Sequence, residues 1–360
     1  MSALTVWHLS SNRWNSAITE YALSAARALM LAGHRSVFTP LAGSPAEARA
    51  ERYLETRAVP RFTVAELGKL RTMAREIRPD VIMTYGGPET FLSKALPGAV
   101  VRFRGQALDA GGFASGARQR FAHAHAALLL APSEALAAQL TALAPEQAAV
   151  CVPLGCDTQV FTRVPAASLG ERPELVVLGR LDPVKGHAAM MRLMVRVLGD
   201  WPGDLPRPRL HVVGEPANLS ATYLTELVKA AGLTFGDDFR LTATRVPDIA
   251  RLLSEATLGV VPSLGSEIIC RVAEEFLLCG TPVVVSGVGS LDEVLFSDAG
   301  GSYRGLGDEE AAALLGAWTR QSLAEGEAAK VARAAQARAL FSLESMGAAL
   351  SRLIEPFSRW

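Results

Sequence analysis

The chain has 360 residues, of which 49% are hydrophobic and 20% charged, and its formal net charge is zero. This length exceeds the usual size of one hydrophobic core and predicts two domains. The composition excludes a disordered or low-complexity protein. The first residues lack the pattern of a secretory signal, and no apolar run reaches the roughly 18 residues that span a bilayer. These features predict a cytoplasmic protein.

Charge is distributed unevenly along the chain. Residues 1–165 contain 17 Lys and Arg against 12 Asp and Glu, whereas residues 166–360 contain 19 against 24. The basic first half fits two alternatives equally, a peripheral contact with an anionic membrane surface and an ordinary solvated face. The excess is small and is not interleaved with aromatic residues, so we expect no nucleic-acid partner.

Short apolar runs alternate with longer amphipathic segments throughout, which is the pattern of βαβ units around parallel sheets. The first unit comprises a strand over 4–10, a helix over 18–32 that Gly33 ends, and a strand over 35–40. Further strands are predicted at 79–84, 99–104 and 127–131. We therefore expect a doubly wound N-terminal domain over residues 1–165.

The segment 162–173, with two prolines and a glycine, is typical of a linker. The alternation then restarts, with strands predicted at 175–179, 209–214, 239–243, 258–263 and 281–286. This predicts a second α/β domain over 166–341, and two such domains leave a cleft at the carboxyl ends of their strands. The last segment, 342–360, is an amphipathic helix that needs a surface to cover.

The segment after the strand at 175–179 contains two cations, Arg180 and Lys185, just before a helix expected to start near Gly186. Free backbone N–H groups at a helix start and two nearby cations suit a diphosphate. Arginine offers a planar fork and lysine a mobile point charge, so together they can stabilise a departing nucleoside diphosphate without a metal. The alternative is a purely structural loop, whose cations pair with Asp182 or with solvent.

A second segment places Glu267 in a loop and Glu275 one to two turns into the following helix, which Gly280 ends. Two carboxylates there can accept hydrogen bonds from sugar hydroxyls. An isolated pair of glutamates would more often be a solvated helix face. No Cys-x-x-Cys pair or histidine cluster of zinc spacing accompanies them, so no metal is expected.

Together these segments resemble the retaining glycosyltransferases of the group 1 class, carbohydrate-active family four. The resemblance covers about residues 125–300 in order and spacing, whereas the N-terminal third matches only in pattern. The motifs that carry it are Pro132-Ser133-Glu134, Val152-Pro153-Leu154-Gly155-Cys156-Asp157, Gly179-Arg180-Leu181 with Lys185-Gly186, Glu267-x7-Glu275, and Cys279-Gly280-Thr281-Pro282.

The resemblance implies a GT-B fold, in which two doubly wound Rossmann-like domains face each other across a cleft and a C-terminal helix crosses back to the N-terminal domain. It implies that Arg180 and Lys185 hold the donor diphosphate, that Glu267 binds the transferred sugar and that Glu275 binds the ribose. The N–H groups of Ile268 and Ile269 would lie near the sugar or the β-phosphate. The register of Cys-Gly-Thr-Pro favours Glu275 over its neighbour Glu274 as the ligand-facing residue.

The N-terminal domain departs from the family's pattern in two places. Asn15-Ser16 stands where members have a glycine-rich turn after the first strand, and Arg102 and Arg104 stand where many have an active-site His or Asp. We take these four residues as candidates for the acceptor side. The two arginines bind an anionic acceptor, stabilise charge on the leaving group or form structural ion pairs, and no general base can be named.

The predicted function is transfer of a hexosyl- or heptosyl-type sugar from a nucleoside diphosphate sugar to a hydroxyl of a cell-envelope glycan or glycolipid, of lipopolysaccharide type, with retention and without a required cofactor. Two alternatives are a non-catalytic sugar-nucleotide-binding subunit and a nucleotide-sugar epimerase on the same fold. A nicotinamide dehydrogenase is disfavoured because no Gly-x-Gly-x-x-Gly follows an opening strand.

Overall fold

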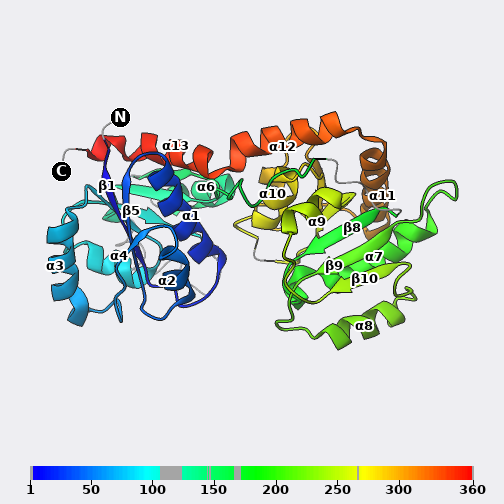
Figure 1. Ribbon diagram of the computed structural model, residues 1–360, viewed down its shortest axis with the longest axis horizontal. Coiled ribbons are helices and arrows are strands. Elements are labelled where there is room, and N and C mark those ends of the chain that lie inside the picture. Colours follow the sequence, from blue (N-terminus) through cyan, green and yellow to red (C-terminus); the bar gives the residue numbers. More distant parts are fainter. Residues whose placement is uncertain are drawn as a thin grey trace. The chain divides into compact units, whose positions relative to one another are not determined.

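The computed structural model describes residues 3–105, 124–143, 145, 147–165, 172–265 and 267–358. The chain divides into two compact units (Figure 1). Unit 1 comprises Met1–Asp157 and Leu340–Trp360, and unit 2 comprises Thr158–Ala339. The predicted domain boundaries lay at 165/166 and 341/342, and the middle of the predicted linker, 166–171, lies outside the described residues.

Unit 1 contains, among its described residues, a seven-stranded parallel sheet of order β3-β2-β1-β4-β5-β6-β7. Its strands are β1 (Thr5–Ser10), β2 (Arg35–Pro40), β3 (Glu55–Thr56), β4 (Val81–Thr84), β5 (Ala99–Phe103), β6 (Leu128–Ala131) and β7 (Ala149–Cys151). Its helices are α1 (Ala17–Leu31), α2 (Pro45–Ala50), the 3₁₀ turn η1 (Val64–Glu66), α3 (Leu67–Ile77), α4 (Gly87–Ser93), α6 (Glu134–Leu143), α13 (Leu343–Ile354) and the 3₁₀ turn η5 (Glu355–Phe357).

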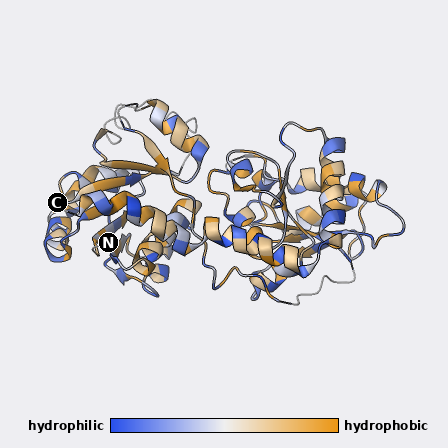
Figure 2. Ribbon diagram, turned by 90° about the horizontal axis from the view of Figure 1, so that it is seen from above, coloured by the Kyte–Doolittle hydropathy of each residue, from blue (hydrophilic) through white to orange (hydrophobic). Residues whose placement is uncertain are grey.

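Alternate residues of β1 face opposite sides of this sheet, as the period of a strand requires. Trp7 and Leu9 belong to a buried cluster with Leu70 and Ile77 of α3. Helix α1, which is not part of this cluster, also packs against β1 and β2. The apolar colour of the strands and the two-toned helices in Figure 2 follow this layering. The sheet is thus covered on both faces, which explains why its strands are apolar runs rather than alternating ones.

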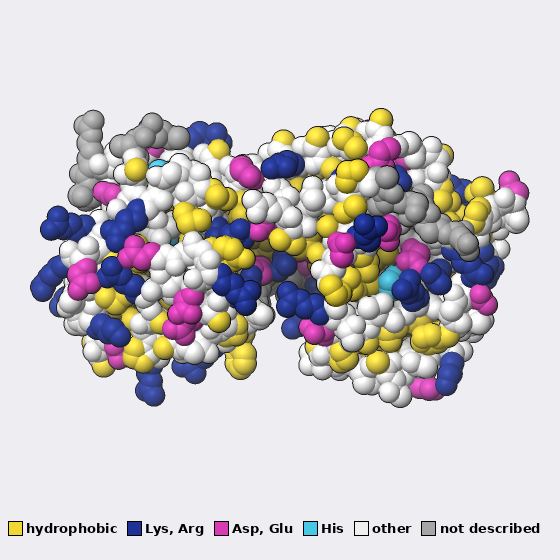
Figure 3. Space-filling model, viewed as in Figure 1, with side chains coloured by type: hydrophobic (Ala, Val, Ile, Leu, Met, Phe, Trp, Pro, Cys, Tyr) yellow, Lys and Arg dark blue, Asp and Glu magenta, His cyan; other side chains and the backbone are white. Residues whose placement is uncertain are grey.

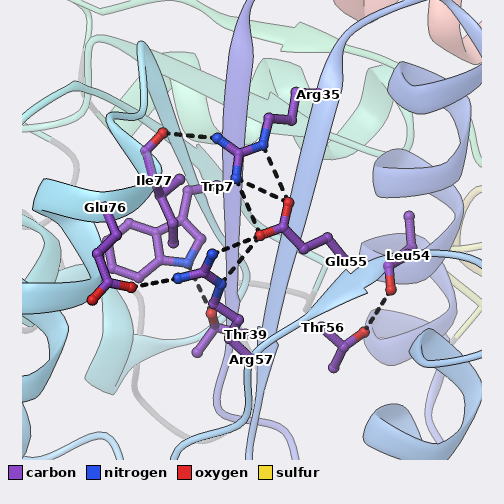
Figure 4. Close-up of polar contacts among 9 residues, drawn as sticks. All are labelled: Trp7, Arg35, Thr39, Leu54, Glu55, Thr56, Arg57, Glu76 and Ile77. Atoms are coloured by element: carbon purple, nitrogen blue, oxygen red, sulfur yellow. Dashed lines mark hydrogen bonds and ion pairs between the residues drawn. The ribbon is translucent and has the colours of Figure 1, made fainter.

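The edge of the sheet at β3 is fixed by an ion-pair network (Figure 4). The carboxylate of Glu55 pairs with the guanidinium groups of Arg35 and Arg57, at 3.0 and 2.9 Å, and Arg57 also pairs with Glu76 at 2.7 Å. Burial raises the pKa of Glu55, but the hydrogen bonds and charges of the two arginines together outweigh it and lower the pKa below its usual value. These pairs are largely exposed, so they contribute modestly to stability, but they bind a two-residue edge strand to the sheet.

The C-terminal helix α13 packs on α1 within unit 1 (Figure 1), as predicted. Gly347 allows a close approach, since a Cβ atom there would lie 2.5 Å from the carbonyl oxygen of Ala28. His34 and Ser351 add a hydrogen bond of 2.9 Å between their side chains. The backbone N–H of Cys156 donates a hydrogen bond of 2.7 Å to the carbonyl of Phe341, which lies just before α13.

Unit 2 contains, among its described residues, a six-stranded parallel sheet of order β10-β9-β8-β11-β12-β13. Its strands are β8 (Glu174–Leu178), β9 (Arg209–Val213), β10 (Phe239–Thr242), β11 (Leu258–Val261), β12 (Val283–Val285) and β13 (Gly300–Ser302). Its helices are the 3₁₀ turn η3 (Pro183–Lys185), α7 (His187–Gly199), α8 (Ala221–Ala230), α9 (Ile249–Glu255), α10 (Arg271–Leu278), the 3₁₀ turn η4 (Leu291–Val294), α11 (Asp308–Ala324) and α12 (Glu327–Phe341).

The core of unit 2 also has two layers of helices around its sheet. Strand residues such as Leu175 and Val212 join α7, α8 and α11 in one buried cluster, which includes Met190 and Leu315. Helix α10 packs against β11 and β12, and its Phe276 fills the space beside Gly259, where a Cβ atom would come within 2.5 Å of the ring. This packing fixes the loop that leads from β11 into α10.

The main predicted strands and helices are confirmed, and three short strands were missed. The missed strands are β3, β7 and β13, of two or three residues each, which carry too few residues to show a period. The predicted terminal helix over 342–360 instead ends at Ile354, and the 3₁₀ turn η5 follows it because Pro356 interrupts the α-helical pattern.

Candidate active site

The loop after β8 holds the predicted cations near the amino end of α7. Gly179 and Gly186 both have positive φ angles, +152° and +73°, which favour glycine. Between them, the side chain of Asp182 caps η3 by accepting a hydrogen bond of 3.1 Å from the N–H of Val184. That hydrogen bond holds the pKa of Asp182 below its usual value. The loop therefore has a fixed shape that carries the cations.

Arg180 lies at the surface of this loop, 61% exposed, and its guanidinium contacts the carboxylate of Asp182 at 3.2 Å. Asn218 donates a hydrogen bond of 2.8 Å to the same carboxylate oxygen. The sequence had left open that the loop cations pair with Asp182 rather than with a ligand, and Arg180 does contact Asp182. This ion pair engages one nitrogen of an exposed arginine, so it orients Arg180 and leaves most of the N–H groups of the guanidinium for a ligand.

Glu267 follows β11 in the loop that leads to α10, and it is 7% exposed. Its carboxylate accepts a hydrogen bond of 2.6 Å from the hydroxyl of Ser263, and its backbone carbonyl accepts one of 2.8 Å from the N–H of Ser290. Gly289 allows this approach, since a Cβ there would lie 2.1 Å from the Glu267 carbonyl oxygen. Glu267 is therefore held in place through both its carboxylate and its backbone carbonyl.

The two loops meet where Lys185 and Glu267 form an ion pair. The side chain of Lys185 remains 26% exposed, whereas that of Glu267 is 9% exposed. A backbone hydrogen bond of 2.8 Å from the N–H of Leu264 to the carbonyl of Val184 joins the same loops. Strands β8 and β11 are neighbours in the sheet, so their carboxyl ends bring these residues together.

The amino end of α7 lies directly after Lys185. Gly186 is its N-cap and provides no side chain to bind the first backbone N–H groups, so these groups and the positive end of the helix dipole are available to an anion. His187 begins the helix, is buried, and contacts the carbonyl of Arg180 at 3.4 Å. Burial lowers the pKa of His187, so its ring is neutral and packs rather than adding positive charge.

Glu274 and Glu275 are both buried on α10, at 3% and 4% exposure. Neither therefore lies on a solvated helix face, which was the alternative to ligand binding. The carboxylate of Glu275 accepts a hydrogen bond of 2.5 Å from Arg271, one turn earlier. Glu274 lies near Cys270, whose thiol pKa is raised by burial and then by the charges of Glu274 and Glu267.

The segment between Glu267 and α10 contains Ile268, which is half-buried, and Ile269, which is buried. Neither backbone N–H donates a hydrogen bond within the part of the chain that the structure describes. Their predicted role as donors to a ligand stays a prediction. The structure thus brings Arg180, Lys185 and Glu267 into one cluster around Asp182 and Ser263, and places Glu275 on α10 with Arg271.

Unit 1 has a pocket of about 460 Å³ at the carboxyl ends of β1, β4 and β5. Arg102 and Arg104, predicted for the acceptor side, both line it, and both are buried. Burial lowers the pKa of Arg102 to about 10, followed by the charge of Arg104, and it lowers the pKa of Arg104 as well. At a pKa of about 10, the guanidinium group of Arg102 is still charged at neutral pH.

Asn15 and Ser16 lie at the start of α1, beside the residues that line this pocket. Ser16 is the N-cap of the helix, and its hydroxyl accepts hydrogen bonds from the N–H of Thr19 at 3.3 Å and from the side chain of Asn12 at 2.6 Å. The amide oxygen of Asn15 accepts one of 3.2 Å from Arg49. The contacts of Ser16 are thus those of a helix N-cap, whereas Asn15 contacts α2 through Arg49.

Sequence reasoning missed Glu89, which lines the same pocket and is fully buried. It follows β4 in the segment Gly86-Gly87-Pro88-Glu89. The available signal was its place just past the carboxyl end of a predicted strand, where parallel sheets bind ligands. It also missed Ser263 as the hydroxyl that holds Glu267.

Within the described ranges, no group of three or more His, Cys, Asp and Glu side chains could hold a metal ion. Among the helices that the structure describes, none is long and apolar enough to cross a membrane. On the face shown in Figure 3, Lys and Arg side chains are interspersed with Asp and Glu side chains over both units. This visible distribution offers no single basic block, so contact with an anionic membrane stays a prediction.

The two Rossmann-like units and the helix α13 on the first are the GT-B fold, as solved structures show. The Anabaena protein HepE in complex with UDP and glucose is similar with a TM-score of 0.75 and 18% identity, over 98% of this chain and 100% of that one. WaaG, described as a glycosyltransferase involved in lipopolysaccharide biosynthesis, has a TM-score of 0.61 and 17% identity, over 97% and 99%. The predicted fold class is confirmed.

Part of unit 2 is also similar in sequence to known proteins. Residues 172–315 match the model of the glycosyl transferases group 1 family, so unit 2 carries a group 1 glycosyl transferase domain and the predicted resemblance is confirmed. D-inositol 3-phosphate glycosyltransferases of Geodermatophilus obscurus and Acidothermus cellulolyticus are 37% and 34% identical over 149 residues. These alignments cover 39% of this chain and 33% of each relative, so the chain matches about a third of their length.

Proposed function

We propose that this protein transfers a sugar from a nucleoside diphosphate sugar to a hydroxyl of a cell-envelope glycan or glycolipid, with retention at the anomeric carbon and without a metal. The observation that carries the proposal is the Lys185–Glu267 ion pair beside the uncapped amino end of α7. It sets a cation and free N–H groups next to a buried carboxylate. A sugar nucleotide carries the complementary groups, a diphosphate and sugar hydroxyls.

The proposed roles follow from the charges. Arg180 and Lys185 stabilise the negative charge that develops on the departing diphosphate, and the first N–H groups of α7 add to this. Glu267, exchanging part of its contact with Lys185, accepts hydrogen bonds from the transferred sugar, and Glu275 accepts them from the ribose. Similar structures solved with UDP and with UDP-glucose support a uridine donor as the first to test.

The test begins with binding. Purified protein is screened against UDP-, GDP- and ADP-sugars by thermal unfolding, because a ligand at 100 times its dissociation constant adds about 2.7 kcal/mol of stability. The donor that stabilises it is then incubated with acceptor glycans and, separately, alone. Transfer with the donor's anomeric configuration, read by NMR and unchanged by EDTA, supports the proposal. An isomerised donor in the incubation without acceptor indicates an epimerase, and binding without any turnover indicates a non-catalytic subunit.

The site assignment is tested with Arg180→Ala, Lys185→Ala and Glu267→Gln. Each removes a preorganised charge, so each should lower kcat/KM by about a hundredfold. The matched control is Arg192→Ala, because Arg192 is an exposed arginine of α7 that contacts only Asp308 at 3.5 Å among the residues described. Parental rates in all three variants would remove the assignment.

Proximity of the acceptor to a membrane is part of the same proposal. It is tested by sedimentation with vesicles that contain anionic lipid, at low and at physiological salt, because contacts between basic side chains and anionic lipids weaken with screening. Equal sedimentation with neutral and anionic vesicles would remove this part and leave the transfer reaction untouched.

A further inference from the structure

Two protein groups bind the same oxygen of the Glu267 carboxylate. The Oε1 atom of Glu267 accepts a hydrogen bond of 2.6 Å from the hydroxyl of Ser263, and the same atom forms the ion pair with the ammonium group of Lys185. The Oε2 atom accepts no hydrogen bond from any group that the structure describes. An ionised carboxylate can accept hydrogen bonds at both oxygens, so one whole oxygen of Glu267 remains available.

This second oxygen is open to a ligand. The side chain of Glu267 keeps 9% of its surface exposed, and Oε2 does not belong to the fully buried polar atoms that lack a partner within the described ranges. The exposed part of the side chain therefore includes Oε2. A carboxylate oxygen in such a place needs donors, which water or the hydroxyl groups of a ligand supply.

The hydroxyl of Ser263 is a fixed donor. Ser263 follows β11 and is 1% exposed, and its carbonyl accepts a hydrogen bond of 2.7 Å from the hydroxyl of Ser286, which follows β12. The N–H of Ser286 donates to the carbonyl of Val261 at 3.0 Å and continues the pairing of these two strands. The position of Ser263 is thus determined by the register of the sheet.

Lys185 is the partner that can be exchanged. Its side chain is 26% exposed, and its ammonium group lies at the end of a flexible four-carbon stem. The residue also lies next to the uncapped amino end of α7, the proposed place of the donor diphosphate. A diphosphate there draws the lysine away from Oε1, because two anions then compete for one cation. The hydroxyl of Ser263 remains to hold the carboxylate.

We propose that Ser263 is a positioning residue for recognition of the donor sugar: it holds Oε1 of Glu267, so that Oε2 faces the sugar hydroxyls when Lys185 turns to the diphosphate. This inference rests on the function proposed above and adds a residue to it. Ser263 touches no substrate and acts only through Glu267. Its removal therefore weakens recognition of the sugar and leaves recognition of the nucleoside diphosphate unchanged.

A serine with a purely structural role would behave differently. If Ser263 only stabilised the loop between β11 and α10, its removal would loosen the contact of that loop with the loop after β8, to which Lys185 belongs. The affinities for a nucleoside diphosphate with and without its sugar would then fall together. Comparison of the two ligands separates the alternatives.

The test measures binding to the full chain by calorimetry, with UDP-glucose and UDP as the probes. Where neither binds, GDP-mannose with GDP and ADP-glucose with ADP replace them. Ser263→Ala should weaken the sugar nucleotide by about tenfold, as expected for a lost hydrogen bond to a charged group, and the nucleoside diphosphate by less than about twofold. The matched control is Ser297→Ala, an exposed serine of the same unit, which should bind both probes as the parent does.

Two further variants test the hydroxyl and its route of action. Ser263→Thr keeps the hydroxyl and should bind the sugar nucleotide within about threefold of the parent protein. In a Glu267→Ala background, Ser263→Ala should change the affinity for the sugar nucleotide by less than about twofold, because no carboxylate remains to be held. Thermal unfolding checks that each variant is folded at the temperature of the measurement.

Three results would overturn the inference: parental affinity of Ser263→Ala for the sugar nucleotide, equal weakening of both probes, or a loss of the same size in the Glu267→Ala background. A folded Ser263→Thr variant that binds as weakly as Ser263→Ala would also overturn the role of the hydroxyl. With transfer intact in the parent protein, each of these results leaves the proposed function standing. Failure of all three pairs of probes to bind the parent would remove the proposed function, and the positioning role with it.

Discussion

Gly186 and Pro262 lie so close that a Cβ atom at position 186 would come within 1.9 Å of the Pro262 carbonyl oxygen. The two residues belong to the loops that follow β8 and β11, the loops that carry Lys185 and Glu267. The hydrogen bond from Leu264 to Val184 fixes the same approach at 2.8 Å. The geometry of the candidate donor site therefore depends on a position where no side chain fits.

Gly186→Ala should destabilise the protein by about 2 kcal/mol or more, because the new methyl group meets a backbone oxygen and φ is +73°. Urea unfolding measures the loss, and donor affinity should fall with it because the loops separate. Gly199→Ala is the control, since nothing lies within 4 Å of a Cβ there and its φ is not positive. Equal stability of the two variants would contradict the close approach.

The two members of the Lys185–Glu267 pair differ in exposure, which predicts unequal costs of breaking it. Lys185→Met leaves the buried Glu267 carboxylate without its cation and should destabilise by about 1 to 2 kcal/mol. Glu267→Gln leaves a partly exposed lysine that water solvates, and should cost less than about 1 kcal/mol. Denaturant unfolding of both single variants and the double variant yields the coupling energy. A larger loss for Glu267→Gln would contradict this order.

Gly347→Ala should weaken the packing of α13 on α1, because its Cβ would lie 2.5 Å from the Ala28 carbonyl oxygen. The overpacking cost of about 1 to 3 kcal/mol exceeds the roughly 1 kcal/mol gained in helix propensity. Thermal unfolding and limited proteolysis near residue 342 measure the effect. Gly68→Ala in α3 meets nothing within 4 Å and should be neutral or stabilising; destabilisation there would indicate that the loss at 347 is not a packing effect.

Glu174 predicts an acid-dependent loss of stability in unit 2. Burial raises the pKa of its carboxyl, but hydrogen bonds and charge from His211 and Arg209 outweigh this and lower the pKa to about 2 from a usual 4.5. The folded state thus binds fewer protons, so the stabilisation is present above pH 4.5 and is lost as the pH falls toward 2.

Glu174→Gln should therefore lose about 1 to 2 kcal/mol at pH 7, after allowance for partial exposure, and should converge with the parent protein near pH 2. Urea unfolding between pH 3 and pH 7, where both proteins stay folded, measures the difference. Glu226→Gln, whose partner Lys229 is equally exposed, should run parallel to the parent at every pH. A constant difference for Glu174→Gln across this range would contradict the assigned pKa.

Much of the fold was predictable because the relevant signals are local. Buried parallel strands such as β2 and β11 are short continuous apolar runs, and glycines such as Gly33 end helices, so both are visible within a window of ten residues. The edge strand β3 was not predictable, because its two residues are held by Arg35 and Arg57 rather than by an apolar pattern.

The candidate site also has a part that the sequence could predict and a part that it could not. Arg180, Lys185, Glu267 and Glu275 could be named from motif spacing, because spacing along a strand-loop-helix segment fixes which side chains reach the carboxyl edge of a sheet. Asp182 could be named as a partner of Arg180, but Ser263 could not be named as the partner of Glu267. Ser263 holds Glu267 within the loop that leads to α10, where no strand or helix period reports the contact, whereas Arg271 holds Glu275 one turn away on the same helix.

The sequence by itself determined that there are two α/β units of parallel strands, that residues 172–315 resemble the group 1 glycosyl transferases, and which charged residues follow the strands of unit 2. Only the tertiary structure decided that Lys185 meets Glu267, and that Glu89 is buried in a pocket with Arg102 and Arg104. The reason is physical: local periodicity reports the burial of each residue on its own element, whereas pairing between elements depends on strand order and on approaches such as that of Gly186 to Pro262, which no local pattern encodes.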